Sequence, residues 1–220
     1  MLKYRCLVLD HDDTVVKSTP IIHYPAFKKT LEKLRPDVNL TLEEFLLYSF
    51  EPGFGPLCHN ILKFTDEEME YQYNTWNEHV QKTVPKFYEG FENIIKKQKD
   101  EGGLVCVVSH SNSVNILRDF KENIGIEPDM IFGWELGEEK RKPSPYPLKE
   151  IMRIYNLEPN ELLMVDDLKP GFDMARSCGV DFACAGWSNQ IPKIAEFMKE
   201  NCDYYFDNVK KLEEFLFNSK

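Results

Sequence analysis

The stretch CLVLDHDDT, residues 6–14, decides the fold of this chain. Its first part, residues 6–9, is an unbroken apolar run that is too short for a helix and lacks polar alternation, which is typical of a strand buried on both faces of a parallel sheet. Asp10, Asp12 and Asp13 follow directly. Carboxylates at the carboxyl end of such a strand lie where open α/β sheets bind ligands. Three carboxylates this close resist ionising together unless a cation or a proton lies among them, so the stretch indicates a metal site.

Other polar groups complement these carboxylates. Ser109 follows a second apolar run, and Asp166 and Asp167 follow a third. Lys142 lies between these two runs in the loop sequence Lys-Pro-Ser-Pro. The order Asp-x-Asp, strand-Ser, Lys-Pro, strand-Asp-Asp resembles the four motifs of the haloacid dehalogenase superfamily of phosphatases and phosphomutases. The resemblance covers nearly the whole chain.

Apolar runs that alternate with segments of helical periodicity predict an α/β fold, a Rossmann-like doubly wound parallel sheet. Strands are predicted at 6–9, 104–108, 130–134, 162–165, 182–185 and 203–207, and helices at 91–99, 114–120, 145–155, 171–178 and 210–217. The spacing of Gly171 and Gly179 is similar to that in the branch of the superfamily that contains phosphoglycolate phosphatases and β-phosphoglucomutases.

Residues 17–84 differ in character from the rest, because they are rich in aromatic and charged residues and helical in period. Thr65 and Glu68 have the spacing of a capping box at the start of a helix. These features predict an all-helical insertion. The resemblance implies that the insertion is a cap between the first and second motifs, and that residues 1–16 and 85–220 form the core domain.

Composition limits the classes of partner. A chain of 220 residues suits one domain with an insertion. The net charge of -10 argues against nucleic acid or an anionic membrane as the main partner, because binding to either needs clustered Lys and Arg. A small phosphorylated metabolite is compatible with this net charge, since its site need only be locally positive. We expect no nucleic acid, no membrane, and a monomer or a weak homodimer.

Cysteine usage and the first residues bear on location. Lys3, Arg5 and Asp10 interrupt any signal-peptide core. The six cysteines show no CxxC spacing, and several fall in apolar segments, as expected of small buried side chains in a reducing compartment. The sequence therefore predicts a cytoplasmic protein.

The acidic residues are assigned to catalysis and to magnesium. Asp10 is the predicted nucleophile, because a carboxylate that attacks phosphorus forms an aspartyl-phosphate and divides one hard displacement into two. Asp12 suits general acid and then general base, if its surroundings raise its pKa. The resemblance implies the same roles, with the backbone carbonyl of Asp12 as a metal ligand. It also implies Asp167 as the principal metal carboxylate and Asp166 as a direct or outer ligand. Hard oxygen ligands, with Asp10 among them, suit Mg²⁺.

The remaining motif residues are assigned to the phosphate group. Donors such as the Ser109 hydroxyl and the backbone amides after it stabilise the charge of a transferring phosphoryl group. His110 is predicted to bind phosphate through its amide, and a contact by its ring remains open. Lys142 is predicted to pair with the phosphate and the nucleophile. Lys140 and Arg141 are neighbouring cations, but the Lys-Pro context favours Lys142.

The sequence assigns no single role to two residues of the first motif or to individual residues of the insertion. Asp13 stands where the family usually has glycine, so it either disturbs the turn, tunes the metal site or points into solvent. His11 is predicted to point away from phosphorus. His23 and Trp76 in the insertion are among the candidates for a substrate pocket, although aromatic residues at helical spacing more often form a core of their own.

The function predicted from these observations is that of a magnesium-dependent phosphatase acting through an aspartyl-phosphate. A phosphomutase of the β-phosphoglucomutase type uses the same first half-reaction and is the main alternative. A catalytically silent phosphate-binding protein is less favoured, because every expected catalytic position is filled. A phosphoacceptor switch of the receiver type is disfavoured by motif order, since the Asp-Asp pair comes last here.

Overall fold

The structure is a computed structural model in which residues 2–218 are described. The chain divides into two compact units. The core unit consists of residues 1–17 and 86–220, and the helical unit consists of Ser18–Pro85.

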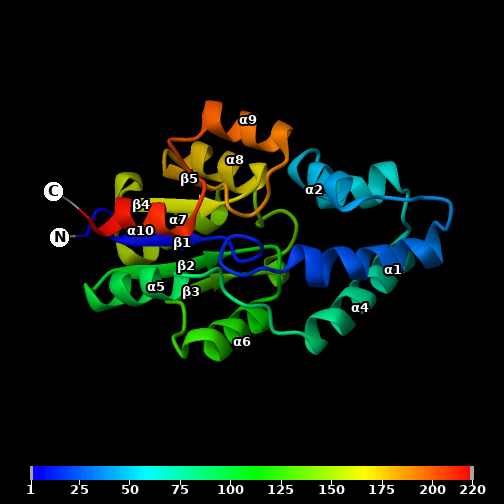
Figure 1. Cartoon of the computed structure of the whole chain (residues 1–220), viewed down its shortest axis with the longest axis horizontal. Helices are drawn as coiled ribbons and strands as arrows, with labels where there is room; N and C mark the ends of the chain where they lie inside the picture. The colour runs from blue at the N-terminus through cyan, green and yellow to red at the C-terminus, as the bar shows by residue number, and fades with distance from the viewer. Residues whose placement is uncertain (1, 219–220) are drawn as a thin grey trace. The chain divides into compact units, whose positions relative to one another are not determined.

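A six-stranded sheet forms the centre of the core unit, and every neighbouring pair of its strands is parallel. The strand order is β3-β2-β1-β4-β5-β6 (Figure 1). The strands are β1 (Cys6–Leu9), β2 (Leu104–Val108), β3 (Met130–Phe132), β4 (Leu162–Asp166), β5 (Asp181–Ala185) and β6 (Tyr204–Phe206). The order reverses at β1, whose four residues are all buried. The carboxyl end of β1 is therefore at the point where doubly wound sheets open a crevice for ligands.

Helices cover both faces of this sheet. The core unit contains α5 (Phe91–Asp100), α6 (Ser113–Ile124), α7 (Tyr146–Tyr155), α8 (Lys169–Cys178), α9 (Pro192–Asn201) and α10 (Val209–Phe217). Leu7 and Leu9 of β1 share an apolar cluster with buried residues of α5, α6 and α10. Met174 of α8 is fully buried outside this cluster, and α8 contacts β4 and β5, so it lies on the opposite face. The arrangement confirms the predicted doubly wound α/β class.

Several predicted element boundaries differ from the structure by one to four residues. The third strand ends at Phe132 instead of residue 134, because a tight turn begins at Gly133, where a Cβ would lie 2.6 Å from the Ser113 nitrogen. The sixth strand is one residue shorter at each end. The helix predicted from Gly171 begins at Lys169, because Pro170 fits the first helical turn, where its missing N–H costs nothing.

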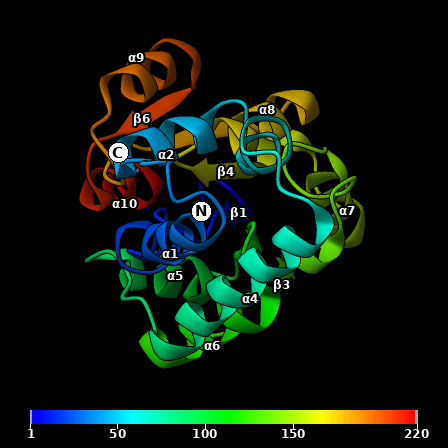
Figure 2. The same ribbon diagram turned by 90° about the vertical axis from the view of Figure 1, so that its right-hand side faces the viewer.

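The helical unit packs around an aromatic core of its own. It contains α1 (Tyr24–Leu34), α2 (Leu42–Phe50), α3 (Phe54–Pro56) and α4 (Asp66–Lys82), with π-helical turns at Thr19–His23 and Leu57–Ile61. The long helices α1 and α4 lie side by side (Figure 2). Phe27, Phe45 and Phe64 are buried together. The predicted capping box at Thr65 and Glu68 is present.

The two linkers meet at the edge of the core unit. Val16 forms an antiparallel bridge with Phe87, and the Lys17 amide donates a hydrogen bond of 2.9 Å to the Lys86 carbonyl. Across residues 2–218, none of the helices combines the length and the apolar character needed to span a membrane.

Candidate active site

The strand arrangement gathers three carboxylates at one edge of the sheet. Asp10 follows β1 and its amide donates to the Val165 carbonyl at 2.8 Å, while Asp166 ends the neighbouring strand β4 and Asp167 follows it. All three side chains are buried, and each offers a carboxylate oxygen within 4.8 Å of the others. The register of β1 on β4 explains this, because Leu9 pairs with Val165 and the next residues are therefore adjacent.

Lys142 enters this cluster from the loop between β3 and α7. Its Nζ lies 2.6 Å from Asp10 Oδ1 and 2.6 Å from Asp166 Oδ2, and the side chain is buried. Burial by itself lowers the pKa of Lys142, but the two carboxylates raise it by more, so the ammonium stays charged. The neighbouring Lys140 is exposed and Arg141 stacks on an aromatic ring, so Lys142 is the cation that meets the acidic cluster.

The cluster still holds more negative than positive charge. Burial raises the pKa of Asp10 to about 7, with Lys142 opposing the shift and Asp166 and Asp12 adding to it. Burial also raises the pKa of Asp167, and the charges of Asp166, Asp10 and Asp13 raise it further. Three buried carboxylates face one ammonium, which is a donor set that fits a hard divalent cation such as Mg²⁺.

Asp166 and Asp167 are each held by a separate hydrogen bond. The Leu168 amide donates to Asp166 Oδ1 at 2.9 Å, and a Cβ at Gly171 would overlap Asp166 Oδ2. Gly171 is therefore required by the position of Asp166. Ser188, which follows β5, donates to Asp167 Oδ2 at 2.9 Å. Sequence reasoning missed Ser188, because it lies outside the four motifs and reaches Asp167 only through the pairing of β4 with β5.

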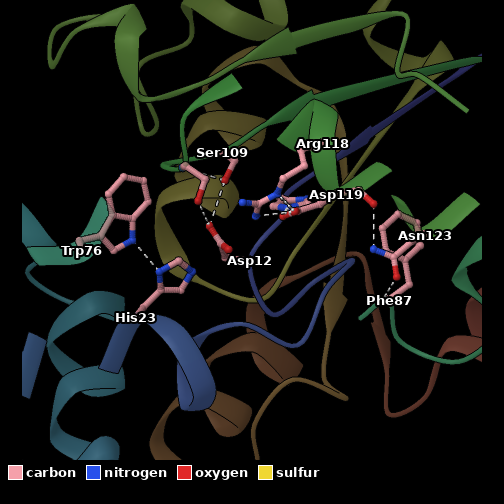
Figure 3. A network of polar contacts seen from close by, with 10 residues as sticks. Asp12, His23, Trp76, Phe87, Ser109, Arg118, Asp119 and Asn123 are labelled. Atoms are coloured by element: carbon pink, nitrogen blue, oxygen red, sulfur yellow. Dashed lines mark hydrogen bonds and ion pairs between the residues drawn. The ribbon is translucent and has the colours of Figure 1, made fainter. Parts of the chain in front are cut away.

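Asp12 lies beside two serines of the loop after β2, and Figure 3 shows it next to Ser109. The Ser111 hydroxyl donates to Asp12 Oδ2 at 2.5 Å, and the Ser109 hydroxyl lies 3.5 Å from the same oxygen. Ser109 Oγ also accepts a hydrogen bond from the Ser111 amide. Sequence reasoning singled out Ser109 and missed Ser111, although its position two residues after Ser109 was a usable signal.

His110 meets the lysine loop. Its Nε2 lies 3.0 Å from the Lys142 carbonyl oxygen. Burial and the charge of Lys142 together lower the pKa of His110 to about 3, so the ring is neutral.

The two unusual residues of the first motif have defined positions. Asp13 has φ = 58°, the left-handed conformation that glycine adopts most easily and that Asp tolerates better than most residues. The turn thus keeps the backbone shape that glycine would give it. His11 is buried, and its Nε2 lies 3.0 Å from Asp119 Oδ2 in α6. Nothing in the sequence indicated Asp119, because the pairing depends on how α6 packs.

His23 and Trp76, two candidates for a substrate pocket in the helical unit, contact each other. Trp76 Nε1 donates to His23 Nδ1 at 2.8 Å, and the two rings stack 6.2 Å apart (Figure 3).

Comparison with known proteins agrees with this geometry. The sequence model of the haloacid dehalogenase-like hydrolases matches residues 7–185. The chain belongs to this family and is an enzyme of the hydrolase class. No curated protein sequence matches the chain.

Solved structures share the fold over almost the full chain. CbbY from Rhodobacter sphaeroides in complex with phosphate is 17% identical with a TM-score of 0.75, covering 95% of this chain and 96% of its own. A protein of Haemophilus somnus named as a predicted phosphoglycolate phosphatase is 16% identical with a TM-score of 0.75, covering 98% and 99%. The haloacid dehalogenase-like protein SP0104 of Streptococcus pneumoniae is 13% identical with a TM-score of 0.74, covering 97% and 98%.

Proposed function

We propose that this hydrolase is a magnesium-dependent phosphatase that acts on a small phosphorylated metabolite through an aspartyl-phosphate at Asp10. The observation that carries the proposal is the position of Lys142, whose Nζ lies 2.6 Å from both Asp10 and Asp166. A nucleophilic carboxylate and a phosphate monoester are both anions. An ammonium held against the nucleophile reduces the repulsion that their encounter would otherwise meet.

The reaction divides into two displacements. In the first, an Asp10 oxygen forms a bond to phosphorus, the bond from phosphorus to the substrate oxygen breaks, and Asp12 gives its proton to the departing alkoxide. In the second, water attacks phosphorus, Asp12 takes the water proton, and the bond from phosphorus to Asp10 breaks. The products are an alcohol and inorganic phosphate, and both aspartates return to their starting states. Ser109 and the amides after it are the proposed donors to the phosphoryl oxygens.

The proposed metal ligands are the side chains of Asp10, Asp166 and Asp167 and the backbone carbonyl of Asp12. When bound, Mg²⁺ supplies a charge that stabilises the phosphoryl oxygens as negative charge spreads over them. The excess of buried carboxylates over ammonium groups at this edge of the sheet supports the assignment.

Small phosphorylated compounds are the proposed substrate class. CbbY is named in complex with phosphate, and a mutant of it in complex with xylulose-1,5-bisphosphate, and both share this fold. In the same proposal the helical unit, Ser18–Pro85, is the cap that selects the substrate. We further propose a cytoplasmic enzyme, which six free cysteines support.

The test is phosphate release from an aryl phosphate and from a panel of phosphorylated metabolites, with and without Mg²⁺. The native chain should release phosphate only with the metal. Asp10→Asn should reduce the rate by at least about a thousandfold, since nothing replaces the nucleophile. Asp173→Asn is the matched control. It removes the same charge as Asp10→Asn, but Asp173 pairs with Lys169 on α8. Equal rates for Asp10→Asn and the native chain would refute the proposal, and isomerisation of a sugar phosphate without release would favour the phosphomutase.

A further inference from the structure

We propose that His110 is a positioning residue for Lys142, which holds the peptide of the lysine so that its ammonium reaches the nucleophile. The inference rests on the proposed function, because it concerns how the ammonium is kept beside Asp10. His110 Nε2 lies 3.0 Å from the Lys142 carbonyl oxygen. A carbonyl oxygen only accepts hydrogen bonds, so Nε2 carries the proton and donates it.

The neutral state of the ring agrees with this role. The pKa of His110 is lowered to about 3 by burial and by the charge of Lys142. A neutral ring that is protonated at Nε2 leaves Nδ1 with a lone pair, and it brings no positive charge to a phosphate. The ring of His110 therefore acts on the lysine loop, whereas its backbone amide remains available to the phosphoryl group.

The loop that carries Lys142 is also held at Arg141, the residue before the lysine, by the aromatic side chain of Trp134. The ring of Trp134 lies edge-to-face with His110, with centroids 6.2 Å apart and an interplanar angle of 88°. The Arg141 guanidinium carbon lies 3.4 Å from the centroid of the same Trp134 ring. Arg141 and Lys142 are consecutive, so one stack and one hydrogen bond hold two adjacent residues of the loop.

Trp134 is itself tied to the loop that carries Ser109. Its amide donates to the Ser111 carbonyl at 2.8 Å. At the preceding residue, a Cβ on Gly133 would lie 2.7 Å from that same oxygen, so the two backbones approach as closely as glycine allows. The serine loop, the Trp134 turn and the lysine loop thus form one continuous contact. Lys142 is positioned relative to Ser109 through His110 and Trp134.

A double-mutant cycle on kcat/KM tests the inference, with His110→Met, Lys142→Ala and the combined variant. Loss of one neutral hydrogen bond predicts a fall of about five- to tenfold for His110→Met in the native background. In the Lys142→Ala background the same substitution should change kcat/KM less than about twofold, because the group that His110 positions is gone. His110→Gln, which places an amide donor near the position of Nε2, should recover most of the loss. Lys140→Met removes a loop charge without touching this contact and should leave the rate unchanged.

Equal losses in both backgrounds would overturn the inference, because His110 would then act on the substrate directly. Nitrogen-15 spectra of the imidazole, assigned with His110→Gln, give a second readout that needs no turnover. The spectra should show the neutral Nε2–H tautomer at neutral pH. A neutral ring protonated at Nδ1 would also overturn the inference. If the native chain binds inorganic phosphate but hydrolyses no substrate, the proposed phosphatase function is refuted, whereas the positioning role of His110 is not. The same four-protein comparison would then be made on the dissociation constant for inorganic phosphate.

Discussion

His11 Nε2 lies 3.0 Å from Asp119 Oδ2, and the two side chains are 1% and 4% exposed. The contact joins the loop that carries Asp10 and Asp12 to α6. It continues beyond Asp119, because Asn123 donates to the Asp119 carbonyl at 2.8 Å and accepts from the Phe87 amide at 3.3 Å (Figure 3). A series of hydrogen bonds therefore runs through the core unit from the loop after β1 to the second linker.

The first prediction concerns this buried contact. His11→Leu should lower the free energy of unfolding by about 2 kcal/mol, because it removes a donor to a buried carboxylate. His11→Gln, whose amide nitrogen can take the place of Nε2, should recover part of the loss. Chemical denaturation measures both. A His11→Leu chain as stable as the native one would show that the hydrogen bond contributes nothing to stability.

The second prediction concerns Ser111. Ser111→Ala removes the donor 2.5 Å from Asp12 Oδ2. It should lower kcat by about tenfold with a smaller change in KM, because Asp12, the proposed general acid, loses its orientation. Steady-state kinetics with an aryl phosphate measure the two constants. Ser177→Ala is the matched control, since the Ser177 hydroxyl donates to the Met174 carbonyl within α8 and lies near Cys178 Sγ, with no contact to Asp12. If Ser111→Ala and Ser177→Ala change kcat equally, Ser111 does not orient Asp12.

The third prediction concerns Gly171. Gly171→Ala should weaken Mg²⁺ binding, because the new methyl group would lie within 2.7 Å of Asp166 Cβ and displace the carboxylate. Mg²⁺ should raise the melting temperature of the native chain, since a ligand that binds only the folded state stabilises it. Gly171→Ala should lose that rise. Gly103→Ala is the control, because it meets Leu2 Cδ1 at 2.6 Å and should destabilise the fold while keeping the rise.

The fourth prediction concerns acid sensitivity in the helical unit. The bidentate hydrogen bonds from Arg35 and the capping amide of Thr65 lower the pKa of Glu68 to about 2 from an ordinary value of 4.5. A lowered folded-state pKa means that Glu68 contributes stability above about pH 4.5 and loses it as the pH falls toward about 2. The difference in melting temperature between the native chain and Glu68→Gln should shrink over that interval. A difference that stays constant over that interval would contradict the stabilising role of ionised Glu68.

The sequence predicted the parts of the fold that depend on local pattern. The apolar runs before Asp10, Ser109 and Asp166 became strands β1, β2 and β4, because a short apolar run between polar loops has few other stable conformations. The boundary at Phe132 was missed, because it depends on how closely the Gly133 backbone approaches another loop. Such contacts lie far apart in sequence and leave no periodic signal.

The same division applies to the candidate site. Asp10, Lys142, Asp166 and Asp167 were named from motifs and lie together in the structure. Ser188 and Asp119 were not named, because each belongs to an element that reaches the site only after the sheet and helices have packed. Motifs identify groups that meet the substrate, whereas the groups that orient them depend on tertiary packing.

The pairing of Val16 with Phe87, and of Lys17 with Lys86, has a consequence for the history of the chain. The two chain segments that connect the helical unit to the core unit are hydrogen-bonded to each other, so a short turn could join Lys17 directly to Lys86. An inserted module whose two ends meet costs the host fold little, since no strand has to move to accept it. This junction is therefore a place where a helical module could be exchanged, shortened or removed while β1, with Asp10 at its end, keeps its neighbours in the sheet.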